Sequence, residues 1–161
     1  MRRMAEVELE GAQDLLIKFK TINNQVQGKV TQFALRKASN VLKKAVVGEM
    51  MRVDRESSRE AIWRNVVVRN KPKRFRKTGE LETRLGILGG ARSRAANEAN
   101  PGGDTFYWRF LEFGTERVPA QRNITKTVKR KQGDFMSTFT REMDKAIDRA
   151  VKRAKKAARD K

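Results

Sequence analysis

Cysteine and histidine are both absent from this chain of 161 residues. Without them there is no disulfide, no thiol nucleophile, no zinc site of the usual kind and no Ser–His or Cys–His catalytic pair. Carboxylate chemistry stays open, but the acidic residues are scattered, and no acid, base and nucleophile converge in the sequence. We therefore expect no enzymatic activity, no cofactor and no metal site.

Long apolar runs are also missing. No apolar segment of about 18 residues occurs, and no apolar run follows the basic start Met1-Arg2-Arg3, so we expect neither a membrane span nor a signal peptide. Hydrophobic residues make up 38% of the chain and charged residues 35%, which predicts exposed arms or loops around the core. The length fits a single domain over residues 1–161, and we expect a soluble intracellular protein.

Positive charge is what the chain has in excess, with a net charge of +19. Residues 69–94 hold nine Lys and Arg against two acids, and residues 119–161 hold fourteen against five. Outside these two basic zones, the rest of the chain has a net charge of only +3. This pattern fits either a solvated surface or contact with nucleic acid or an acidic protein surface.

The first third of the chain carries strand and helix patterns in turn. Residues 5–10 alternate apolar and acidic side chains, which predicts a half-buried strand, and Gly11 ends it. Apolar residues then recur at helical spacing, which predicts a short first helix: Leu15, Leu16, Phe19 and Ile22. From residue 26 the apolar side chains recur on one face of a long helix, which ends between residues 51 and 54.

The middle of the chain predicts two strands and their connections. A capping-box pattern at residues 57–60 precedes a short helix at residues 61–63. The β-branched run at residues 66–68 predicts a central strand, and residues 81–88 predict a strand with one buried face. A flexible loop rich in Gly, Ala and Asn follows at residues 89–104.

Between the two strands lies a basic loop, residues 69–80. Its cations are candidates for contact with DNA or with an acidic partner: Lys71, Lys73, Arg74, Arg76 and Lys77. Phe75 lies among them and could stack on a base, whereas the other interpretation is a solvated hairpin tip.

The densest aromatic window is residues 106–113, with five of the eleven aromatic residues of the chain. A helical turn that is capped by Thr105 and stopped by a left-handed Gly114 is one interpretation. A strand that enters at residues 106–108 is the other, because periodicity does not separate the two in so short a run.

One carboxylate, Glu112, lies among these rings. If it is buried, it needs an Arg or a backbone N–H as a partner, because an unpaired buried charge is costly. We expect the simpler arrangement, an exposed carboxylate on a half-buried turn. Phe106 and Trp108 could anchor an interface, but we expect them in the core.

The last part of the chain is predicted to be helical from Asn123, with a break at Gly133 and with Asp134 as the N-cap of the final helix. An apolar stripe runs along that helix: Phe135, Phe139, Met143, Ala146, Ile147, Ala150, Val151, Ala154 and Ala157. Basic residues dominate toward its end, which gives a basic helical tail over residues 134–161, where the helix dipole favours cations.

One motif in the aromatic window resembles a known family. Phe110-Leu111-Glu112-Phe113-Gly114-Thr115 is followed by Pro119-Ala120-Gln121, and Tyr107 supplies a leading aromatic. This arrangement is similar to the signature of the phage neck proteins, also called head–tail joining or tail-completion proteins, of the gene-product-ten-like family of lambdoid long-tailed phages. Thr78-Gly79-Glu80-Leu81 resembles the Thr-Gly-x-Leu step of that family. The candidate assembly motif is therefore Tyr107, Phe110, Glu112, Phe113, Gly114, Thr115, Pro119 and Ala120.

The resemblance implies an α+β fold, in which a small, mostly antiparallel sheet packs against a long helix and a long basic helix ends the chain. It implies a structural protein of the virion neck, made in the host cytoplasm and present as a homo-oligomeric ring around the DNA path. The implied partners are the head connector and the tail terminator or tail-tube proteins, with DNA in the channel as a further candidate. Six copies would match the symmetry of the tail.

A basic nucleic-acid-binding protein, similar to a nucleoid or ribosomal component, is the alternative function. The net charge of +19 and the basic tail support it, although no RRM, KH or zinc pattern is present.

Overall fold

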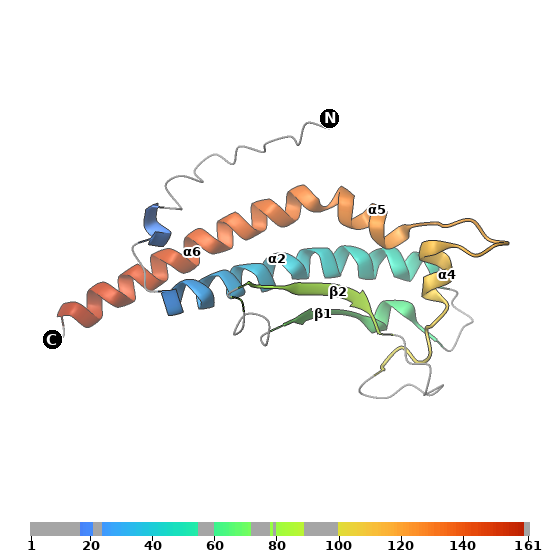
Figure 1. Ribbon diagram of the computed structural model, residues 1–161, viewed down its shortest axis with the longest axis horizontal. Coiled ribbons are helices and arrows are strands. Elements are labelled where there is room, and N and C mark those ends of the chain that lie inside the picture. The colour runs from blue at the N-terminus through green and yellow to red at the C-terminus, as the bar shows by residue number, and fades with distance from the viewer. Residues whose placement is uncertain are drawn as a thin grey trace.

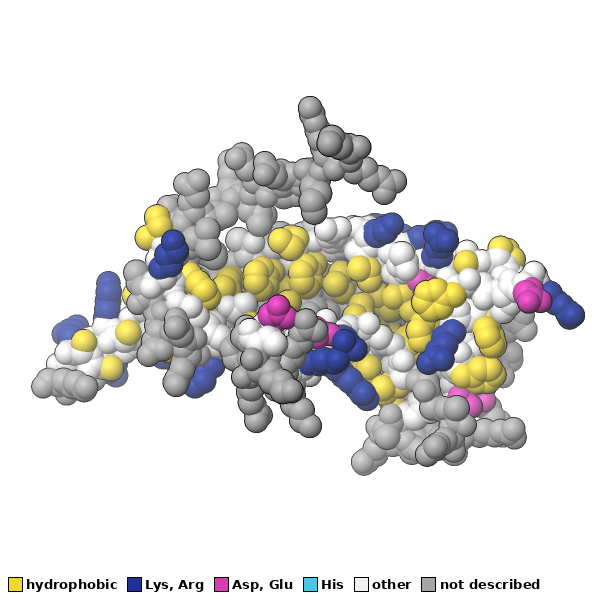
Figure 2. Space-filling view, viewed as in Figure 1, with side chains coloured by type: hydrophobic (Ala, Val, Ile, Leu, Met, Phe, Trp, Pro, Cys, Tyr) yellow, Lys and Arg dark blue, Asp and Glu magenta, His cyan; other side chains and the backbone are white. Residues whose placement is uncertain are grey.

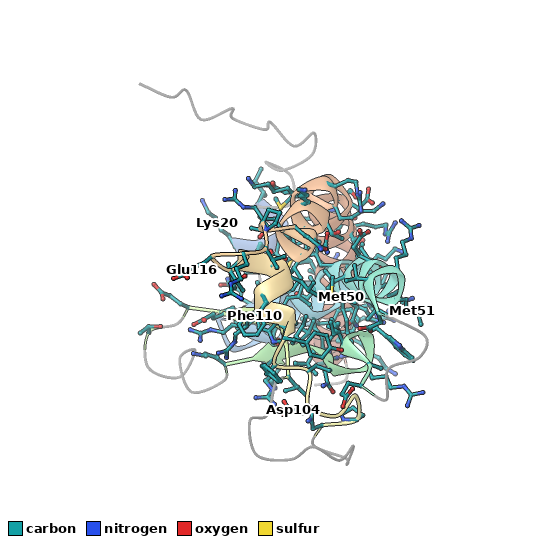
Figure 3. All side chains as sticks on the ribbon, turned by 90° about the vertical axis from the view of Figure 1, so that its right-hand side faces the viewer. Lys20, Met50, Met51, Asp104, Phe110 and Glu116 are labelled. Atoms are coloured by element: carbon teal, nitrogen blue, oxygen red, sulfur yellow. The ribbon has the colours of Figure 1, made fainter. Side chains whose placement is uncertain are left out.

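A long central helix, α2 (Asn24–Val53), organises the fold. The computed structural model describes residues 17–20, 24–54, 60–71, 78, 80–88 and 100–159. Helix α6 (Gln132–Arg159) lies antiparallel to α2 on one side, and a two-stranded sheet lies on the other side (Figures 1 and 3). The expected α+β class is confirmed, with an antiparallel sheet on a long helix and a long C-terminal helix.

The first core cluster joins the N-terminal half of α2 to α6. Val30 and Ala34 of α2 are buried against Met143 and Ile147 of α6. Small residues at a helix contact let the two axes approach closely, and Ala34 is fully buried at this contact. The predicted stripe of α6 is confirmed in this region, whereas the alanines near its C-terminal end are exposed.

The second core cluster surrounds the C-terminal half of α2. Val46 and Met50 of α2 are buried against Ile62 and Val66, which come from the segment below the helix. Ile62 begins η1 (Ile62–Asn65), a 3₁₀ helix at the place where a short helix was predicted. Half-buried side chains complete the cluster, among them Trp63, Leu85, Ile87, Tyr107, Trp108, Leu111, Ile124 and Val128.

The sheet consists of β1 (Val66–Asn70) and β2 (Thr83–Ile87), which pair in antiparallel register with Val66 opposite Ile87. β-Branched side chains favour the pleated backbone, and one face of the strands packs on α2. Both strands were predicted. The expectation of a central strand at residues 66–68 is not met within the described part of the chain, where the sheet has two strands and β1 has β2 as its neighbour.

The C-terminal region forms α5 (Asn123–Arg130) and α6, with the break at Lys131. The predicted break at Gly133 is therefore wrong by two residues, and Gly133 lies in the first turn of α6. Asp134 is not the N-cap but a first-turn residue, whose carboxylate accepts a hydrogen bond of 2.8 Å from Lys131 Nζ. An acid there complements the positive end of the helix dipole.

Near the start of the chain, residues 17–20 form a helical turn against the α2–α6 pair. Lys18 Nζ lies 3.2 Å from Asp144 and 3.6 Å from Asp148, and Phe19 packs on the first core cluster. The strand predicted at residues 5–10, the capping serine at residue 57 and residues 89–99 of the predicted loop lie outside the described residues. None of the described helices is long and apolar enough to cross a membrane.

Candidate assembly surface on α4

Helix α4 (Trp108–Phe113) lies at one end of the molecule, beside the C-terminal end of α2 (Figure 1). A helical turn leads into it, since the backbone N–H of Trp108 donates to the carbonyl of Thr105 at 3.1 Å. The helical interpretation of this window is confirmed and the strand is wrong. Thr105 is not the predicted cap, because its hydroxyl donates to the carbonyl of Leu88, just after β2, at 2.9 Å.

Gly114 ends α4 with a backbone φ of 77° and a ψ of −179°. The positive φ agrees with the prediction, whereas this ψ differs from that of a left-handed helical cap. Its N–H donates to the carbonyl of Phe110 at 2.9 Å. A Cβ at this position would lie 2.8 Å from both Ala120 N and Val118 O. The site therefore requires glycine for its backbone conformation and for its space.

The residues after Gly114 turn back along α4. The N–H of Thr115 donates to the carbonyl of Val118 at 2.8 Å, and the Thr115 hydroxyl accepts from the N–H of Val118 at 3.1 Å. After the exposed Pro119, the N–H of Gln121 donates to the carbonyl of Leu111 at 2.9 Å. The motif from Tyr107 to Ala120 thus folds as one hydrogen-bonded unit.

Glu112 is the buried centre of this unit, with 4% of its surface exposed. Its two carboxylate oxygens accept from the backbone N–H of Ile124 at 2.8 Å and of Thr125 at 2.9 Å, and also from the Thr125 hydroxyl. The expectation of an exposed carboxylate is wrong. Among the possible partners of a buried Glu112, the backbone N–H groups are the ones that the structure uses.

These bonds make Glu112 the cap of α5. The first N–H groups of a helix have no partner within it, and the residue before α5, Arg122, makes no side-chain cap and has a φ of 54°. Glu112 supplies the missing acceptor from another helix, together with a negative charge at the positive end of α5. Hydrogen bonds to a charged group contribute about 1.5–3 kcal/mol each, so this contact fixes α4 against α5.

Asn65 fixes the chain just before α4, and sequence reasoning missed it. Its amide Nδ2 donates to Thr105 Oγ1 at 2.8 Å and to the carbonyl of Gly103 at 3.0 Å. Its Oδ1 accepts from the N–H of Gly102 at 2.7 Å. The side chain is fully buried, so its polar atoms need these partners. The only signal for this site was the turn sequence Asn100-Pro101-Gly102-Gly103.

Asp54 joins the end of α2 to η1. Its Oδ2 accepts from the backbone N–H of Trp63 at 3.2 Å, whereas its buried Oδ1 has no hydrogen-bond partner among the described residues. Burial raises the pKa of the Asp54 carboxyl, and hydrogen bonds from the N–H groups of Trp63 and Ile62 offset part of that rise.

The side chains of α4 divide between two faces. Tyr107, Trp108 and Leu111 pack into the second core cluster. The exposed fractions are 52% for Phe106, 48% for Phe110 and 71% for Phe113. The expected core position is therefore wrong for Phe106, whose ring instead contacts the Phe110 ring edge-on at 5.9 Å on the outer side.

We call the exposed large hydrophobic side chains of this unit the α4 aromatic surface: Phe106, Phe110, Phe113 and Val118. Figure 3 looks onto this end of the molecule, with Phe110 and Glu116 on one flank and Met51 on the opposite flank. In the space-filling view, hydrophobic side chains form a band over α2 that continues to this end (Figure 2). Exposed aromatic side chains on a fixed backbone are typical of protein interfaces.

Of the predicted basic contacts, the structure describes Lys71 alone. Lys71 is exposed, and its Nζ lies 4.0 Å from Glu82. Lys73, Arg74, Arg76 and Lys77 lie outside the described residues. The basic end of α6 is at the other end of the molecule from α4 (Figure 1), with its cations exposed: Lys152, Arg153, Lys155, Lys156 and Arg159.

Comparison of the chain with protein-family models, curated proteins and solved structures finds no match. Within the described ranges, no three acidic side chains gather in a way that could hold a metal ion. We therefore take the α4 aromatic surface as the candidate functional site, on the basis of its exposed aromatic side chains and its hydrogen-bonded backbone.

Proposed function

We propose that the chain is a structural assembly protein of a phage neck, which joins the head connector to the tail as one subunit of a ring around the DNA path. One observation carries the proposal. In the motif that resembles the neck-protein signature, Glu112 holds the backbone from inside, while Phe110 and Phe113 are exposed on the outer face.

This division of roles suits assembly. When the backbone of a surface is already fixed, less conformational entropy is lost as a partner binds to it. Large aromatic side chains supply much of the binding energy of protein interfaces. Phe113 has 71% of its surface exposed in the single chain, so contact with another protein would remove considerable apolar area from water. The partner is another copy, the head connector or a tail protein.

The alternative, a nucleic-acid-binding protein, is favoured by a different observation. Residues 152–159 hold five cations and no acid on an exposed helix end. In the neck proposal, some of these cations face the DNA path or acidic neighbours. Binding to random duplex DNA, measured against salt concentration, separates the two functions, because a dedicated DNA-binding protein gives a steep salt dependence.

The test of the neck function is deletion of the coding sequence from the genome that carries it, followed by electron microscopy of the particles. We expect DNA-filled heads and separate tails, with joined particles restored when the intact chain is supplied. Joined, infectious particles made without the chain would refute the proposal.

A variant pair then tests the α4 aromatic surface itself. Phe110→Ser combined with Phe113→Ser should fold, because both side chains are exposed, yet fail to restore joined particles. Met51→Ser is the matched control, since Met51 is 51% exposed on the opposite flank of the same end (Figure 3). Equal rescue by both variants would assign the contact to another surface.

A further inference from the structure

A groove lies between the N-terminal half of α2 and the C-terminal half of α6, far from α4. Its volume is 580 Å³, and it is lined by Val26, Lys29, Val30, Phe33, Ala146, Arg149, Ala150, Arg153 and Ala154. The floor is apolar and the rim carries three cations. A volume of this size accommodates several side chains of a bound segment.

The cations of the rim have no acidic partner in the part of the chain that the structure describes. Lys29, Arg149 and Arg153 make no ion pair with any residue that the structure describes. The Arg149 guanidinium instead lies over the Phe33 ring, 5.3 Å from its centroid, and Lys37 Nζ lies 5.7 Å from the same centroid. The groove therefore suits a segment that presents apolar and acidic side chains together.

The chain itself contains such a segment. Residues 5–10 read Ala-Glu-Val-Glu-Leu-Glu, and residues 4–17 hold four acids and no Lys or Arg, in a chain whose net charge is +19. Residues 5–10 lie outside the described residues. Their apolar side chains match the apolar lining of the groove, and their acidic side chains match its cations.

We propose that residues 5–10 of one copy bind the groove of a neighbouring copy. Val7 and Leu9 meet the apolar floor, while Glu6, Glu8 and Glu10 meet the cations of the rim. The inference rests on the proposed ring and adds to it a contact between successive subunits.

The position of the helical turn at residues 17–20 favours a neighbouring groove over the chain's own. Lys18 pairs with Asp144, whereas the groove is lined by Arg153, nine residues further along α6. At about 100° per residue, these two positions lie about 180° apart around the helix. The described chain therefore begins, at residue 17, on the far side of α6 from the groove, so an arm that entered its own groove would first have to pass around α6. Sixteen extended residues span up to about 50 Å, which is long enough to reach a neighbouring copy.

A segment that leaves one subunit and enters the next makes a head-to-tail contact between two different surfaces. Contacts of this kind generate closed rings when the rotation between subunits closes. The arm and groove thus supply a subunit contact that leaves the α4 aromatic surface available for the head or tail proteins.

Cross-linking tests the contact directly, because the chain has no cysteine to give a background. A full chain carrying Leu9→Cys is mixed with a full chain carrying Ala154→Cys, and a short bismaleimide is added. Ala154 lies in the groove and is exposed. The matched control replaces Ala154→Cys with Ser137→Cys, an exposed position of α6 outside the groove.

We expect a cross-linked dimer with Ala154→Cys at a yield several-fold above that with Ser137→Cys. Changing Glu6, Glu8 and Glu10 to Gln should reduce that yield to the control level. Equal yields at the two positions, no dimer at either, or only an intramolecular product in the Leu9→Cys/Ala154→Cys double variant would overturn the proposal. Loss of the dimer on adding duplex DNA, with no effect of the glutamine changes, would assign the groove to nucleic acid and also overturn it.

The result is separable from the neck function. Normal head–tail joining by a chain whose arm gives no cross-link would remove the arm contact and leave the neck function in place. Failure of the intact chain to support joining would remove the function, whatever the cross-link shows.

Discussion

The two ends of the molecule are held together in different ways. At the α4 end, directional polar contacts add to the apolar second core cluster: Glu112 is bound to the start of α5, and Asn65 is bound to residues 102–105. At the other end, α2 and α6 meet through apolar contacts such as Ala34 and Ile147. Apolar contact is non-directional, whereas hydrogen bonds specify one geometry. The backbone geometry is therefore fixed more precisely beside the α4 aromatic surface than at the contact between α2 and α6.

The largest expected loss of stability comes from a substitution of Glu112, at the centre of the α4 end. Glu112→Ala removes the acceptor for the N–H groups of Ile124 and Thr125 and should lower the free energy of unfolding by about 2–4 kcal/mol. Urea unfolding of the purified chain measures the change. Glu116→Ala, an exposed acid of the same region, is the control and should change stability by less than about 0.5 kcal/mol. Equal stabilities for the two variants would contradict the capping role.

The next effect tests the second polar contact. A Cβ on Gly102 would lie 2.1 Å from the carbonyl oxygen of Ala61 and 2.8 Å from Asn65 Cγ. Gly102→Ala should therefore destabilise the fold by about 1–3 kcal/mol, because the Asn65 contacts must shift. Gly86→Ala in β2 meets nothing within 4 Å and serves as the matched control in thermal unfolding. If Gly102→Ala melts at a temperature no lower than Gly86→Ala, the turn at residue 102 can make room for a Cβ without loss of stability, which would contradict the prediction.

A smaller change in stability, of opposite sign, is expected from a substitution in α2. Gly48 lies within α2, and a Cβ there meets nothing within 4 Å. Gly48→Ala should raise stability by about 0.5–1 kcal/mol, since alanine loses less backbone entropy in a helix. The same unfolding experiment measures it, and a destabilised variant would mean that α2 requires glycine for another contact.

The smallest effect depends on pH. Burial raises the pKa of Asp54, so the native chain keeps that proton to higher pH than the unfolded chain does. The contribution of Asp54 to stability therefore falls as pH rises through a window that opens at about pH 4. Asp54→Asn keeps an acceptor for the N–H of Trp63 and should lack this slope. Parallel pH profiles for the two chains would contradict the shift.

Helices and strands were largely predictable because their apolar patterns are local. The stripe of α2 and the β-branched run of β1 lie within single elements, and both gave the right type of structure. The break between α5 and α6 was misplaced, because glycine and aspartate at residues 133 and 134 are turn formers that the structure keeps inside a helix.

The candidate site was harder to predict because its contacts are not local. Glu112 was expected to be exposed, since its partners lie at least twelve residues downstream on another helix. Thr105 has the side chain of a cap, but the end of β2 uses its hydroxyl. Phe106 has a large apolar side chain typical of a core residue, yet its position just before α4 leaves it exposed. The motif itself was found, whereas the direction in which each side chain points required the fold.

The contact between Glu112 and α5 also has a consequence for the order of folding. It joins residues only 12 apart, whereas the pair of Lys18 with Asp144 spans 126 residues. Loop-closure entropy grows with the logarithm of loop length, which makes the longer closure costlier by about 2 kcal/mol. The α4–α5 unit is therefore expected to form before α6 packs against α2. Pulse-labelled hydrogen exchange would then show protected amides at Ile124 and Thr125 before Ile147, so that the aromatic surface exists before the helical layer closes.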